Sequence, residues 1–110
     1  MNKEELLETF PEFKDIVHER IVREPEFAAG LFREAMQCFI EGEPELGKGM
    51  LRDYIMGTIG WKELAHMMNK HDKSLMRMLS DKGNPQADNF FEIIRQLQRF
   101  NGVKVRVEVS

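Results

Sequence analysis

A chain of 110 residues is long enough to bury one hydrophobic core but too short to bury two, so we expect a single unit. No apolar run approaches the ~20 residues that a membrane-spanning helix needs, and the first ten residues are charged where a signal peptide is apolar. These features predict a soluble, cytoplasmic protein. The single cysteine excludes an internal disulfide, and Cys38 lies in an apolar helical pattern where we expect it to be buried.

The formal net charge of −3 conceals a difference between the two parts of the chain. Residues 1–60 carry 7 Lys and Arg against 13 Asp and Glu, whereas residues 61–110 carry 9 against 6. Only the second part is expected to approach phosphate groups easily. The acidic first part suits a basic protein partner, and it is equally compatible with an ordinary solvated surface.

Three related segments of the first part have the composition of helix starts: FPEF at 10, EPEF at 24 and EPEL at 43. Proline is tolerated at the first helical position, and a following glutamate favours the positive end of the helix dipole. Apolar residues then recur at helical spacing, which predicts that the first part is helical. Gly42 stands where a helix end needs a left-handed residue, and Gly57 and Gly60 predict a helix end before Trp61.

The segment LAHMMNKHDKSLMRMLS, residues 64–80, is either one amphipathic helix or two short ones. Periodicity does not decide, because the apolar residues lie on one stripe in both cases. Residues 69–72 include poor helix formers, Asn69 tolerates a left-handed backbone, and Asp72 can cap a helix that begins at Lys73. We therefore predict two helices, 61–69 and 73–80, which is the arrangement of a helix-turn-helix unit.

The last part of the chain contains a predicted helix and a predicted strand. After the turn-forming DKGNPQ, residues 87–100 resume a helical pattern that Asp88 or Asn89 could cap.

The final VKVRVEV alternates strictly, which predicts a β-strand. A lone strand lacks a pairing partner, so we expect it to pair with the same strand of a second copy or with the sheet edge of another protein; a disordered tail is the alternative. The valines on one face of this strand, expected to contribute to dimerisation, are Val103, Val105, Val107 and Val109.

From EPEFAAGLFREAMQCFIEGEPEL through WKELAHMMNKHDKSLMRMLSDKGNP to FFEIIRQLQ, the chain resembles the HigA-type addiction-module antidote proteins, which are lambda-repressor-like helix-turn-helix (Xre) regulators. The resemblance covers about residues 24–100. Its most specific portion comprises LA at 64–65, SL at 74–75, Arg77 and LSDKGNP at 79–85. It implies an all-α lambda-repressor-like bundle over 24–102. Residues 1–23 look like an added helical extension that the resemblance does not explain, and residues 103–110 are the C-terminal β-strand predicted from the alternation. The chain departs from the family at Asn69, where Gly is usual, at Lys70, where a buried aliphatic is usual, and at His71, where Ser or Thr is usual.

The resemblance implies a DNA-binding transcriptional regulator, the antitoxin of a type II toxin-antitoxin module, which represses its own operon. The implied partners are double-stranded operator DNA, a second copy in a homodimer, and a RelE/HigB-like toxin held by the acidic helices or by the terminal strand. The alternative is a protein-interaction module of the same fold that has lost DNA binding, with Lys70 and His71 as the trace of that loss. No catalytic or metal-binding constellation is recognisable, so we expect neither an enzyme nor a cofactor.

If the second helix of the pair enters a DNA groove, its first residues face base edges and its flanks face phosphates. The candidates for base contact are Asp72, Lys73, Ser74 and Arg77, and those for backbone contact are Lys62, Lys70, His71 and Lys82. The neighbouring methionines are expected to fill the core, except Met76, which lies off the apolar stripe and is available to a thymine methyl group or a partner.

Overall fold

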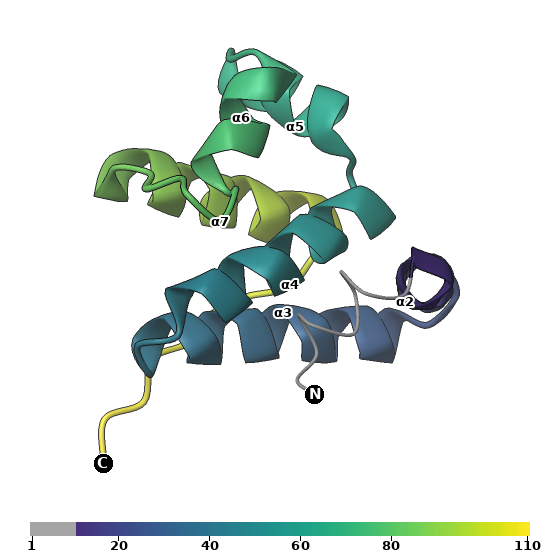
Figure 1. The fold of residues 1–110 in the computed structure, drawn as a ribbon. Helices are drawn as coiled ribbons and strands as arrows, with labels where there is room; N and C mark the ends of the chain where they lie inside the picture. The colour runs from purple at the N-terminus through teal and green to yellow at the C-terminus, as the bar shows by residue number, and fades with distance from the viewer. Residues whose placement is uncertain (1–10) are drawn as a thin grey trace.

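The computed structural model describes the backbone of residues 11–110 and the side chains of residues 16–110. These residues form six α-helices, and none of them is in a β-strand. Figure 1 shows α3 and α4 side by side at one end of the molecule and the α5–α6 pair at the other, on the far side of α7. The helices are α2 (Pro11–Arg23), α3 (Pro25–Ile40), α4 (Pro44–Gly57), α5 (Trp61–Met68), α6 (Asp72–Met78) and α7 (Ala87–Asn101).

Proline marks the start of each of the three helices described in the acidic part, as predicted. Pro11, Pro25 and Pro44 each occupy the first position of a helix, where no backbone N–H is needed. Gly42 follows α3 with φ of +85°, and Gly60 precedes α5 with φ of +81°, so both glycines supply the backbone conformation that ends or redirects a helix. The first ten residues of the predicted N-terminal extension lie outside the described residues.

One hydrophobic core joins all six helices. Its fully buried members include Leu51 and Ile55 of α4, Leu64 of α5, Leu75 of α6 and Leu97 of α7. Cys38 is buried within α3, as predicted. The helix α2 also belongs to this core, because its Ile21 side chain is buried. The all-α prediction is therefore confirmed for the described residues.

A polar contact also fixes α2 on α4. The Nε2 atom of His18 lies 2.8 Å from Oδ1 of Asp53, whose side chain is buried. A buried carboxylate is costly without a hydrogen-bonding partner, so this pair restricts how α2 can lie across α4.

The predicted C-terminal β-strand is absent from the described chain. Residues 103–110 leave α7 after Gly102 and run as a chain without regular structure (Figure 1). Val103 packs against the core and the Val105 N–H donates to Oε1 of Gln98 at 2.6 Å, whereas Val107 and Val109 are 81% and 89% exposed. A strand requires a neighbouring strand for its backbone hydrogen bonds, and residues 11–102, all helix and connecting turns, offer none.

The predicted helix caps are displaced by one or more positions. The capping residues are His71 for α6 and Gln86 for α7, and neither side chain makes a capping hydrogen bond. Asp72 and Asp88 instead lie inside the first turns, where their carboxylates accept from the backbone N–H groups of Lys73 and Asn89 at 2.8 and 2.9 Å. Each still places negative charge at the positive end of the helix dipole.

Within the described part of the chain, no helix combines the length and the apolar character that crossing a bilayer requires.

Candidate nucleic-acid interface

The break between α5 and α6 is a tight turn at Asn69. This residue has φ of 54° and ψ of 47°, and it is the one non-glycine residue with positive φ among the described residues. The N–H of Lys70 donates to the Ala65 carbonyl at 2.9 Å and that of Asn69 to the His66 carbonyl at 3.1 Å. This hydrogen-bond pair is the Schellman arrangement, in which asparagine tolerates the left-handed position usually taken by glycine. The prediction of two helices is confirmed.

Few side chains anchor the pair to the core. Trp61, Leu64 and Ala65 are buried from α5, whereas Leu75 is the one buried residue of α6, with Leu79 buried directly after it. Met67, Met68 and Met78 are partly buried against the core, as predicted for core-filling methionines.

The face of α6 that points away from Leu75 and the core is open to solvent. Lys73, Met76 and Arg77 are exposed, and their spacing of three and four residues puts them on one face of the helix. Ser74 and Asp72 are half-buried at the beginning of the helix. The side of α6 that faces away from the core therefore carries two cations and one apolar side chain.

The remaining residues predicted to contact DNA lie in the turns on either side of α6 or in α5, and they are exposed. Lys70 and His71 form the turn before α6, Lys82 lies in the turn after it, and Lys62 is in the first turn of α5. Lys70 is exposed. We expected a buried aliphatic side chain here if the chain followed the HigA-type pattern that it resembles. None of the eight predicted DNA-contact residues is buried.

Two cations of α4 contact the turn that follows α6, and sequence reasoning did not identify them. The Nζ of Lys48 donates to the Gly83 carbonyl at 2.7 Å and to the Asp81 carbonyl at 3.2 Å. The Nη1 of Arg52 donates to the Leu79 carbonyl at 2.6 Å. One signal was available: Lys48 precedes the buried Leu51 and Ile55 by three and seven residues, which places it on the buried stripe of α4.

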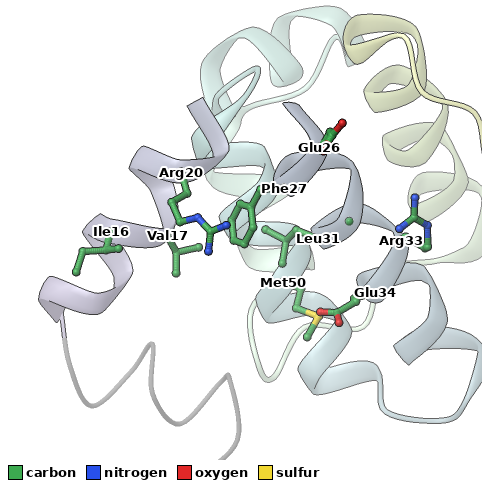
Figure 2. A pocket seen from close by; sticks show the side chains of 10 residues that line it. Ile16, Val17, Arg20, Glu26, Phe27, Leu31, Arg33, Glu34 and Met50 are labelled. Atoms are coloured by element: carbon green, nitrogen blue, oxygen red, sulfur yellow. The ribbon is translucent and has the colours of Figure 1, made fainter. Parts of the chain in front are cut away.

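A separate apolar groove lies between α2 and α3. Figure 2 shows it lined by Val17, Phe27 and Leu31, and its volume is about 540 Å³. The Arg20 guanidinium lies 4.1 Å from the centre of the Phe27 ring and also donates to Glu24 at 2.9 Å, a hydrogen bond that lowers the pKa of the Glu24 carboxyl group. The groove presents apolar surface with charged groups at its edge.

No cluster of three or more His, Cys, Asp and Glu side chains within the described residues is arranged to hold a metal ion.

Comparisons of the chain with family models, with curated proteins and with solved structures find no match. The resemblance to the HigA-type antidote proteins therefore stays a prediction that depends on the residues quoted for it.

Proposed function

We propose that this protein is a DNA-binding transcriptional regulator in which α6 is the recognition helix. The observation that carries the proposal is the division of α6 into two faces. Leu75 fixes one face to the core, while Lys73, Met76 and Arg77 occupy the exposed face directly after a tight turn. A helix held in this way is able to enter the major groove, which is about 12 Å wide.

The side chains on this face have complementary roles in the proposal. Arg77 donates to guanine O6 and N7 or to a phosphate, and Lys73 contacts a phosphate or a base edge. Ser74 is short enough for the helix to approach the bases closely. Four flanking residues contact the phosphates on either side of the groove: Lys62, Lys70, His71 and Lys82. The positive balance of residues 61–110 favours such an approach.

We further propose that the active species is a homodimer paired through residues 103–109. Val107 and Val109 are exposed, whereas Val103 packs against the core and the Val105 N–H is bonded to Gln98. An antiparallel pair with a second copy would supply the missing strand partner, and the Val105 N–H would then exchange its bond to Gln98 for one to that copy. Two recognition helices related by a two-fold axis then read an inverted repeat, with half-sites about 34 Å apart.

The antitoxin role follows from the family resemblance and from the charge of the first part of the chain. Residues 1–60 are strongly acidic, which suits a basic RelE/HigB-like toxin. The rival proposal is a protein-interaction module without DNA binding. It is favoured by apolar side chains exposed away from α6, such as Ile40 at 73% and Phe91 at 66%.

The deciding experiment measures binding to the DNA directly upstream of the coding sequence, with Arg77→Ala and a control, Arg99→Ala. Arg99 is an exposed arginine of α7 outside the proposed interface. Loss of a base contact by Arg77→Ala should weaken binding by about 1–3 kcal/mol, while Arg99→Ala should bind like the unmodified protein. Far-UV circular dichroism should show unchanged helicity for both variants.

A salt titration separates the two proposals. Phosphate contacts give a steep negative dependence of affinity on salt concentration, with a slope of about −0.9 per contact. If the unmodified protein does not bind this DNA, or binds without salt dependence, the rival is favoured. If it binds and Arg77→Ala has the same affinity, α6 is not the reading element.

A further inference from the structure

We propose that Lys48 and Arg52 of α4 are positioning residues for DNA binding, which hold α6 through the turn at residues 79–83. The DNA-binding part of this inference rests on the proposed function. The local part, that these two cations fix the turn, depends only on the contacts described next.

Lys48 is a buried cation whose hydrogen bonds all reach the turn. The residue is 5% exposed, and its amine donates to the Gly83 and Asp81 carbonyls. A buried ammonium group is costly unless its hydrogens are paired, so the position of Lys48 and the position of these carbonyls depend on each other. Both carbonyls follow the C-terminal end of α6, where the helix dipole also favours a positive charge.

Arg52 lies one helical turn further along α4 and binds the beginning of the same segment. Its guanidinium donates to the Leu79 carbonyl at 2.6 Å and, more weakly, to Oδ1 of Asp81 at 3.4 Å. The two side chains therefore contact the segment at residues 79, 81 and 83. Because both come from one face of α4, the segment is tied to a long helix of the core.

The turn transmits this constraint to α6 because it folds tightly against the end of that helix. The Ser80 hydroxyl donates to the Arg77 carbonyl at 2.7 Å, and the Gly83 N–H donates to the Ser80 carbonyl at 2.9 Å. A Cβ atom on Gly83 would lie 2.1 Å from the Arg77 carbonyl oxygen. The backbone of Arg77, the residue proposed to read the DNA, is thus in contact with the segment that Lys48 and Arg52 hold.

Such a constraint is needed because α6 has little stability of its own. It has seven residues and buries one side chain, whereas isolated helices shorter than ~12–15 residues are marginal in water. Lys48 does not act as a phosphate contact, because its amine is buried and bonded to carbonyls. Its removal should therefore change affinity without changing the salt dependence.

The test compares Lys48→Met, which keeps the length of the side chain and removes its donors, with Lys82→Met as the matched control. Lys82 is exposed in the same turn. Amide hydrogen exchange, measured without DNA, should accelerate at least about tenfold at Ser80 and Gly83 in Lys48→Met, while Leu51 and Ile55 change less than about twofold. In Lys82→Met, exchange at all four amides should match that of the unmodified protein.

If Lys48 only contributed to overall stability, exchange at all four amides would accelerate together, and that outcome would overturn the inference. Unchanged exchange at Ser80 and Gly83 would overturn it as well. If Lys48→Met does not fold, the same measurement on Arg52→Met decides, since Arg52 is only partly buried.

The affinity for DNA tests the second part of the inference, that the held turn positions α6 for binding. Lys48→Met should bind the upstream DNA about tenfold more weakly with an unchanged salt slope, whereas loss of a phosphate contact in Lys82→Met should reduce the slope by about 0.9. Equal affinity of Lys48→Met and the unmodified protein would refute the positioning role. If the unmodified protein does not bind DNA, the proposed function fails, and hydrogen exchange alone still decides whether the two cations hold the turn.

Discussion

The region of α3 and α4 and the region of α5 and α6 are stabilised in different ways. The first contains helices of 16 and 14 residues that pack along each other, and α4 alone has eight buried residues. The second contains helices of eight and seven residues, of which α6 has one buried residue. A short helix with one anchor depends on its tertiary contacts, and the rest of its surface is left available to a partner.

Replacing the anchor of α6 should have the largest effect. Leu75→Ala removes a side chain that is 0% exposed, so the free energy of unfolding should fall by about 2–5 kcal/mol, as for other buried leucines. Urea unfolding followed by circular dichroism measures this change. The control is Met76→Ala, next in the chain and 40% exposed, which should change stability by less than about 0.5 kcal/mol. Equal effects of the two substitutions would break the comparison, because α6 would then have no preferred buried face.

Alkaline pH should weaken the α3–α4 region through Tyr54, the one tyrosine of the chain. Burial raises the pKa of its hydroxyl group from 10.0 to about 12. The folded state therefore keeps the neutral phenol, and this contribution is complete below pH 10 and is lost as pH rises toward 12. Each pKa unit corresponds to about 1.4 kcal/mol, so the loss in the free energy of unfolding should be no more than about 3 kcal/mol.

Two measurements check this pH dependence. Tyrosinate absorbance should titrate near pH 12 in the folded protein, and unfolding free energies between pH 10 and 12 should fall more for the unmodified protein than for Tyr54→Phe. Titration of Tyr54 near its ordinary pKa of 10.0 in the folded protein would show that its hydroxyl group is not buried.

Two glycine substitutions should have opposite signs in the two regions. Gly83→Ala places a methyl group 2.1 Å from the Arg77 carbonyl oxygen, so the backbone must move, and we expect a loss of about 1–3 kcal/mol. Gly30→Ala lies inside α3 with no atom within 4 Å of the added carbon, and it should gain about 0.5–1 kcal/mol from the better helix propensity of alanine.

Thermal unfolding of the two glycine variants gives the comparison directly. A lower midpoint temperature for Gly83→Ala and a higher one for Gly30→Ala are expected. A lower midpoint temperature for Gly30→Ala would mean that there is no open space around Gly30. An unchanged midpoint temperature for Gly83→Ala would mean that the turn after α6 is loosely packed.

Local sequence signals predicted much of the fold and the candidate interface. The starts of helices at Pro25 and Pro44 and the break at Asn69 depend on backbone preferences of single residues, and such preferences are readable from the chain. The exposed face of α6 follows from helical spacing around Leu75. The alternation of valines after Gly102 also indicated a strand, but strand formation needs a second segment, and the described chain contains none.

The sequence by itself therefore determined where helices begin, where the chain turns and which face of α6 is apolar, because these depend on neighbours within a few residues. Only the tertiary structure decided that Lys48 is buried against the turn at 79–83, that His18 meets Asp53, and that residues 103–110 lack a strand partner. These outcomes join residues far apart in the chain, whose approach depends on how whole helices pack.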